Sequence, residues 1–142
     1  MTRIEFFFNV EDKLQKIAEL CDSAVRKGRR LMVYSADAET TARLEHYLWS
    51  SPAIGFTPHC RPDHTLAEVT PIIVDCHGEK LIHDDVLVNL QSQYPPFFSR
   101  FRRLIEIVGL DEADRSAARE RYRFYRDRGY EIKLLDQTGT AI

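Results

Sequence analysis

The sequence predicts a single α/β domain spanning residues 1–142, with a three-layer α/β/α arrangement and a mostly parallel, Rossmann-like sheet that lacks a phosphate-binding loop. Short apolar runs of about five residues alternate with longer segments whose apolar residues recur at helical spacing. Glycine, proline or aspartate stands at many of the boundaries. Because strands and helices alternate, we expect right-handed crossovers between parallel strands.

The first half of the chain supplies two strands and two helices. Residues 4–8 are apolar and aromatic, which predicts a strand buried on both faces. Asp12 is placed to cap the following helix, and Gly28 is placed to end it. A second strand is predicted over 30–34, after which Asp37 is placed to cap a second helix.

The second half adds four strands and one helix. Apolar runs predict strands over 72–75, 86–90 and 104–108, and an edge strand over 131–135. Asp111 is placed to cap the intervening helix, with acidic residues in its first turn. Gly129 stands where a glycine commonly ends a helix. The segment from 104 to 129 is therefore predicted to be strand, tight turn and helix.

This last helix carries a row of cations. At about 100° per residue, an arc expected to lie on the sheet comprises Ala117, Ala118, Phe124 and Tyr125. Beside it, the arginine stripe follows the spacing i, i+4, i+7, i+11 and comprises Arg115, Arg119, Tyr122 and Arg126. One interpretation is a solvated face whose arginines pair with Asp127, Glu120 or nothing. The other is a site for an anionic partner, because no acidic residue stands within the stripe itself.

Composition limits the class of partner. A net charge of −2 argues against a general nucleic-acid binder, so any recognition of anions must be local. The three cysteines, Cys21, Cys60 and Cys76, form no CxxC pair and indicate reduced thiols in a cytosolic protein. No signal peptide or long apolar run is present, and we expect a soluble, cytoplasmic chain.

A nucleotide cofactor is not expected. The predicted connection between the first strand and helix, residues 9–12, contains two carboxylates and no glycine, whereas a phosphate site needs close approach of backbone N–H groups. Asp37 stands near the position of a ribose-binding acid, but without the glycine loop we interpret it as a helix cap.

Helical periodicity lapses over 49–70, a stretch with three prolines and exposed-looking aromatics. We expect a long loop here. Trp49 and Phe56 either fold onto the core beneath this loop or form a protein interface, since aromatic residues dominate interface hot spots.

Two stretches resemble a known family. RLIEIV at 103–108 followed by AARERYRFYRDRGYE at 117–131 is similar to the C-terminal signature of the chi subunit of bacterial DNA polymerase III, an accessory protein of the clamp loader. The order LW, two further residues, Pro, and then F-x-P-H at 56–59 resembles the same family. The resemblance implies a non-catalytic adaptor that binds the psi subunit and the acidic C-terminal tail of single-stranded-DNA-binding protein.

The resemblance also implies residue roles. By position, the surface for psi comprises Trp49, Pro52, Phe56 and Pro58. The family's partner tail ends in an aromatic residue that carries the free carboxylate. Arg119 is expected to hold that carboxylate, because a guanidinium can grip it bidentately. Val108 and Tyr122 are expected to line the pocket for the ring, while Arg115 and, more weakly, Arg126 attract the upstream carboxylates.

The sequence offers two alternative functions. A metal-dependent hydrolase would use residues of the segment 59–85, namely His59, Cys60, His64, Cys76, His77, His83, Asp84 and Asp85, but their spacing matches no metal motif. A direct nucleic-acid-binding module would need a basic groove and a stacking platform, so we expect weak binding to bare single-stranded DNA. No nucleophile motif is present, and the chain is not expected to be an enzyme.

Overall fold

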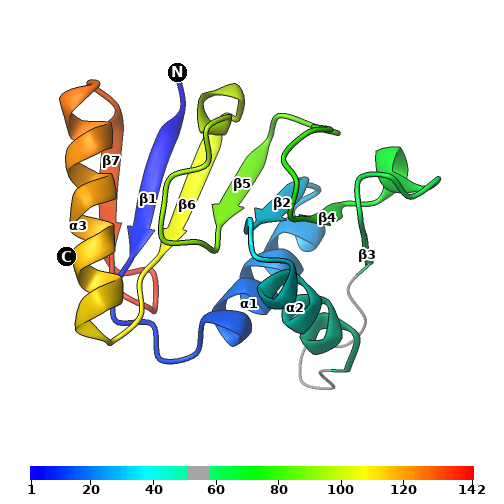
Figure 1. The fold of residues 1–142 in the computed structure, drawn as a ribbon, viewed down its shortest axis with the longest axis horizontal. Helices are drawn as coiled ribbons and strands as arrows, with labels where there is room; N and C mark the ends of the chain where they lie inside the picture. The colour runs from blue at the N-terminus through cyan, green and yellow to red at the C-terminus, as the bar shows by residue number, and fades with distance from the viewer. Residues whose placement is uncertain (51–57) are drawn as a thin grey trace.

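The computed structural model, which describes residues 1–50 and 58–142, contains one sheet of seven strands whose neighbours all pair in parallel (Figure 1). The strands are β1 (Arg3–Phe7), β2 (Leu31–Tyr34), β3 (His59–Cys60), β4 (Ile72–Asp75), β5 (Val86–Asn89), β6 (Arg103–Ile107) and β7 (Glu131–Leu135). The helices are α1 (Lys13–Arg26), α2 (Ala38–Ser50) and α3 (Glu112–Asp127), with short 3₁₀ helices η1 (Ala67–Val69) and η2 (Phe98–Arg100). The predicted α/β fold is confirmed.

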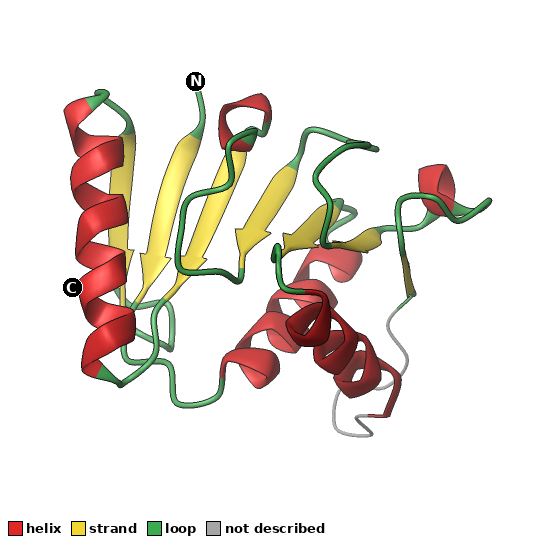
Figure 2. Cartoon of the chain, in the orientation of Figure 1, coloured by secondary structure: helices red, strands yellow, loops and turns green. Residues whose placement is uncertain are grey.

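The order of strands across the sheet is β3-β4-β2-β5-β6-β1-β7 (Figure 2). The first strand of the chain therefore lies between β6 and β7, pairing Ile4 with Leu104 on one side and with Ile132 on the other. The predicted edge position of β7 is confirmed. All strands point the same way, so the segments that follow β1 and β6 leave the sheet at the same edge, where α1 and α3 begin (Figure 1).

Two hydrophobic clusters lie on opposite faces of the sheet. α1 and α2 bury their apolar sides in the cluster that contains Ile17, Cys21 and Leu44. α3 buries Ala118 and Tyr125 in the other cluster. Figure 1 shows α3 alongside β7 and β1, away from α2, which contacts β4. Each helix layer thus covers a different part of the sheet.

Side-chain caps fix where the helices begin and end. The Asp12 carboxylate accepts the Gln15 N–H at 3.2 Å, and the Asp111 carboxylate accepts the Asp114 N–H at 2.7 Å. Gly129 follows the last residues of α3 with a φ of +80°. L-residues rarely adopt that conformation, so a glycine is suited to end the helix there. The capping positions predicted at the first and last helices are confirmed.

The stretch predicted as a long loop from residue 49 differs from the structure in two ways. Trp49 and Ser50 form the last residues of α2, so the helix continues farther than expected. Beyond the undescribed residues, His59 and Cys60 form β3, and η1 follows. A two-residue strand exists through its pairing with Ile72 and Ile73, and such long-range pairing leaves no periodicity in the sequence.

Candidate protein-binding surface on helix α3

The turn between β6 and α3 is tied to the turn between β1 and α1. The Val108 N–H donates to the Phe7 carbonyl at 2.9 Å, and the Val108 carbonyl accepts the Val10 N–H at 3.0 Å. Because both loops leave the same edge of the sheet, these bonds hold the start of α3 beside the loop that contains Asn9.

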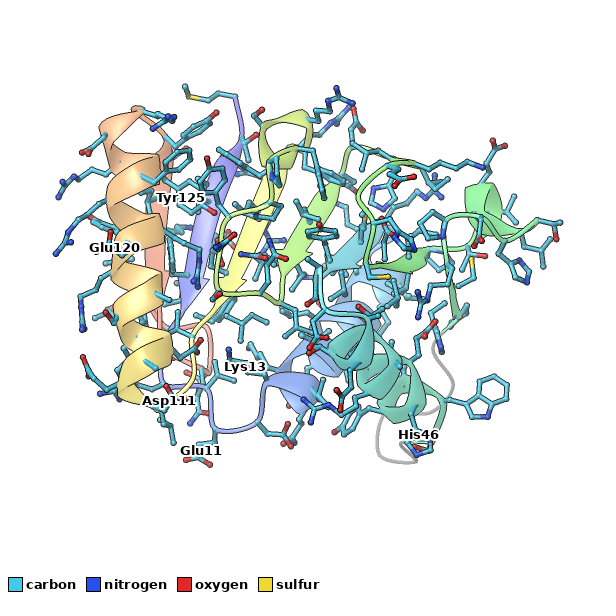
Figure 3. The ribbon with its side chains drawn as sticks, viewed as in Figure 1. Glu11, Lys13, His46, Asp111, Glu120 and Tyr125 are labelled. Atoms are coloured by element: carbon cyan, nitrogen blue, oxygen red, sulfur yellow. The ribbon has the colours of Figure 1, made fainter. Side chains whose placement is uncertain are left out.

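Asp114 strengthens this junction. Its carboxylate accepts the Gly109 N–H at 2.5 Å and pairs with Lys13 of α1 at 2.8 Å. Burial alone would raise the pKa of Asp114, but Lys13 and the Gly109 N–H together lower it below its ordinary value. Figure 3 shows Lys13 and the capping residue Asp111 near the same end of the molecule. The first turn of α3 is therefore fixed against α1.

A buried polar network anchors the middle of α3. The fully buried Glu106 carboxylate of β6 accepts hydrogen bonds from Arg121 Nε at 3.0 Å, from the Tyr125 hydroxyl at 2.5 Å and from Asn89 Nδ2 at 3.0 Å. Burial raises the pKa of Glu106, and these donors oppose the rise. Arg121 Nη1 also donates to the Ser92 carbonyl at 2.6 Å. We call Asn89, Glu106, Arg121 and Tyr125 the Glu106 network.

The network corrects the predicted sheet-facing arc of α3. Ala118 and Tyr125 are buried as expected, but Ala117 and Phe124 are only partly buried. Arg121, which lies on the same face of α3 as Ala118 and Tyr125, is also buried. A charged residue was not expected to face the sheet. The available signal was Glu106, a single carboxylate in an otherwise apolar strand, which needs a buried hydrogen-bond donor opposite it.

The arginine stripe lies beside this buried face and is accessible to solvent. Arg115 Nη2 donates to the side-chain carbonyl of Asn9 at 3.0 Å. Arg119 Nη2 pairs with Glu112 at 2.5 Å, and their side chains are 53% and 75% exposed. The stripe itself contains no acidic residue, yet Glu112 reaches Arg119 from seven residues earlier. Exposed pairs of this kind are weak, so the guanidinium stays available to a ligand.

Tyr122 is the aromatic member of the stripe. Its ring meets Phe6 edge to face, with centroids 6.1 Å apart, and Phe6 stacks on Phe8. The Arg126 guanidinium lies 6.0 Å from the Tyr122 centroid and pairs with Asp127 at 3.2 Å, as the solvated-face interpretation expected. Tyr122 is partly buried and so presents one part of a fixed ring to solvent.

Val108 is fully buried in the same hydrophobic cluster on which Tyr122 packs. It exposes no surface and forms part of the buried cluster beneath Tyr122. A direct contact between Val108 and a ligand ring stays a prediction.

Two of the four residues expected to face psi lie among the described residues. Trp49, at the end of α2, is 71% exposed, as expected for an interface residue and not for a core tryptophan. Pro58 is partly buried just before β3. Pro52 and Phe56 lie outside the described residues. Trp49 and Pro58 thus flank the segment 51–57 from its two ends.

The structure does not favour the metal-dependent hydrolase. Among the described residues, no three His, Cys, Asp or Glu side chains come together in a way that could hold a metal ion. Several serve local structure instead. His64 Nδ1 accepts the Leu66 N–H at 3.0 Å, and the Asp85 carboxylate accepts the Arg30 N–H at 3.0 Å.

His83 makes stability depend on pH. Burial, with a contribution from Arg30, lowers its pKa from 6.5 to about 4, and its Nδ1 accepts the Asp85 N–H. Since the unfolded chain binds this proton more readily, stability is fully present above pH 6.5 and falls as pH decreases toward 4. We expect a loss of roughly 1–2 kcal/mol, limited by the partial exposure of the ring. Urea unfolding at several pH values measures it.

The control is His83→Gln, which keeps an acceptor for the Asp85 N–H but does not titrate. This variant should lose part of the pH dependence, whereas a glutamine at the exposed His46 should not. Equal pH dependence in the unmodified protein and His83→Gln would show that His83 contributes nothing.

Comparison with known proteins identifies the family. The family model described as "DNA polymerase III chi subunit, HolC" matches residues 1–133. The chain belongs to the DNA polymerase III chi subunit family. Chi-family relatives named DNA polymerase III subunit chi include that of Pseudomonas aeruginosa, 32% identical over 94% of this chain and 95% of the relative. Those of Escherichia coli and Haemophilus influenzae are 25% and 27% identical, over 83% and 90% of this chain and 81% and 92% of each relative.

As a member of this family, the chain is an accessory subunit of DNA polymerase III and so a component of a DNA replication assembly. The predicted resemblance is confirmed. Within the described residues, no helix is both long enough and apolar enough to span a membrane.

Proposed function

We propose that this chi-family chain is a non-catalytic, cytoplasmic adaptor that binds the psi subunit with one surface and the acidic C-terminal tail of single-stranded-DNA-binding protein with the arginine stripe. It would thereby link the clamp loader, through psi, to coated single-stranded DNA. One observation carries the proposal for the tail: an accessible guanidinium, Arg119, stands one turn from a partly exposed ring, Tyr122, on a helix anchored by the Glu106 network.

Arg119 suits the terminal carboxylate. Its present partner, Glu112, is 75% exposed and pairs with it at the surface, so an incoming carboxylate can replace Glu112 at little cost. A planar guanidinium binds a carboxylate with two parallel hydrogen bonds, which fixes the orientation of the peptide end.

Tyr122 suits the aromatic ring of the same terminal residue. Its contact with Phe6 and the fixed position of α3 leave the ring little freedom. A preorganised aromatic surface loses little conformational entropy when a second ring packs on it. The carboxylate and the ring of one residue could therefore be bound one helical turn apart.

The outer arginines suit the acidic residues upstream. Arg115 is held by a neutral amide, that of Asn9, and keeps its full charge for attraction. Arg126 pairs with Asp127, whose negative charge offsets part of the positive charge of Arg126. Long-range attraction by such rim charges raises association rates more than it raises affinity.

The test is a titration with a fluorescent acidic peptide that ends in an aromatic residue with a free carboxylate. Arg119→Ala should weaken binding by about 1.5–3 kcal/mol, the range for a hydrogen bond between charged groups. An amidated peptide and a peptide without its final aromatic residue should lose at least as much. Arg115→Ala should mainly lower the association rate and the salt sensitivity.

Two further variants sharpen the result. Glu112→Gln removes the competing carboxylate and should bind the peptide more tightly than the unmodified chain. Arg26→Ala breaks another exposed pair, with Asp22 on α1, and should change nothing. If Arg119→Ala binds the peptide as tightly as the unmodified chain, the stripe is only a solvated helix face.

A further inference from the structure

α3 borders a groove on the edge opposite the arginine stripe. The segment after β5 forms one wall with Tyr94 and Pro96, and α3 forms the other with Ala117, Glu120, Arg121 and Phe124. The groove encloses about 610 Å³. At about 100° per residue, its α3 residues lie about 100° to 160° around the helix from Arg119, so the two surfaces lie on different sides of α3. We call it the Tyr94 groove.

Its apolar wall is a rigid stack. The rings of Tyr94 and Phe124 are nearly parallel, 15° apart, with centroids separated by 3.9 Å. The Arg128 guanidinium lies 3.8 Å from the Phe124 centroid. Two groups this close to one ring must occupy its two faces, so Phe124 is sandwiched between Arg128 and Tyr94. Tyr94 also meets Phe98 edge to face, and with 37% of its surface exposed it lines the groove.

Arg121 contributes unused hydrogen-bond donors to the same groove. Arg121 is only 3% exposed, yet its side chain lines the groove. A guanidinium has five N–H donors. Nε donates to Glu106 and Nη1 to the Ser92 carbonyl, and Nη2 donates to no acceptor among residues 1–50 and 58–142. Among the described residues, the buried polar side-chain atoms without a partner do not include Nη2, so this nitrogen is open to solvent in the groove, where the acceptor of a ligand can take the place of water.

The surrounding charges favour an uncharged acceptor. The Glu106 carboxylate, 3.0 Å from Arg121 Nε, already balances the guanidinium. Glu120 adds a second carboxylate to the lining, paired at the surface with Arg123 (Figure 3 labels Glu120 on α3). A phosphate would meet both carboxylates, whereas a peptide carbonyl would meet no like charge.

The groove has the dimensions of a short extended peptide. From Ala117 to Phe124, α3 rises about 10 Å, the length of about three extended residues. We propose that the Tyr94 groove binds an uncharged, extended peptide segment of a partner protein. An aromatic or other apolar side chain packs on Tyr94, and a main-chain carbonyl accepts from Arg121 Nη2. This site is separate from the arginine stripe.

The experiment titrates N-acetylphenylalanine amide, which combines an uncharged ring with peptide carbonyls, into the full ¹⁵N-labelled chain. We expect saturable chemical-shift changes, at millimolar ligand, in the Arg121 Nε–H and the backbone of 117–124. N-acetylalanine amide should bind more weakly. Tyr94→Ala should weaken binding about three- to tenfold, the value of one aromatic contact. Ala117→Phe fills the groove and should abolish binding.

Ser116→Phe is the matched control, because it adds the same ring to the exposed face of α3 and should leave binding unchanged. If Ala117→Phe fails to fold, Tyr94→Ala decides, since it truncates a partly exposed side chain outside the Glu106 network. Unsaturable shifts, or shifts that Tyr94→Ala leaves intact, would overturn the proposal. Saturation by adenosine monophosphate in place of the amide would assign the groove to a nucleotide instead.

Discussion

Replacing Arg121 with alanine should lower the free energy of unfolding by about 3–5 kcal/mol, the cost of leaving a buried charge without its partner. Glu106 would keep the hydrogen bonds from Tyr125 and Asn89 but lose its cation in a site with no access to water. The Ser92 carbonyl would also lose its donor. Urea unfolding followed by circular dichroism measures the change.

The controls separate burial from charge. Arg119→Ala removes an exposed arginine of the same helix and should change the free energy of unfolding by less than about 1 kcal/mol. The double variant Glu106→Leu and Arg121→Met should recover part of the loss, because it removes both charges together. A loss below about 1 kcal/mol in Arg121→Ala would mean that the Glu106 network does not anchor α3.

Trp49→Ala should abolish detectable binding to psi at micromolar concentrations and leave the fold intact. Truncating a hot-spot tryptophan costs at least about 2 kcal/mol of binding free energy. With 71% of its surface exposed, Trp49 contributes little to the core, so its removal should barely change the unfolding midpoint. Isothermal titration with purified psi, beside a thermal melt of the variant, measures both quantities.

Leu110→Ala offers a comparison, because Leu110 is another large exposed hydrophobic, 52% accessible, at the start of α3. It should bind psi normally. If Trp49→Ala binds psi as well as Leu110→Ala does, or if Trp49→Ala unfolds, the interface with psi lies elsewhere.

The elements that the sequence predicted well are those with local signals. The predicted strands lie within one residue of the observed bounds, since each is a short apolar run between turn residues. Asp12 and Asp111 could be placed as caps because a cap acts on backbone groups two or three residues away. Neither inference required knowledge of the tertiary structure.

What could not be predicted depends on distant partners. Arg121 follows the helical spacing of the buried Ala118 and Tyr125, but a buried arginine needs a carboxylate partner, and its contact with Glu106 depends on how α3 packs on β6. Likewise, the pairing of Arg119 with Glu112 depends on rotamers, so the spacing predicted a shared face but not the ion pair. The Tyr94 groove needs Tyr94 and Phe124 in contact, which a sequence separation of thirty residues conceals.

The position of β1 bears on how the chain is made. Arg3 pairs with Arg103 and Glu131, residues that leave the ribosome 100 and 128 positions later. The first strand therefore has no neighbour until β6 has been synthesised and gains its second neighbour only with β7, so it must remain unpaired or be shielded during that time. Contacts of such long sequence range also slow folding. Premature termination before residue 131 would leave one edge of the strand RIEFF open to pairing with other chains.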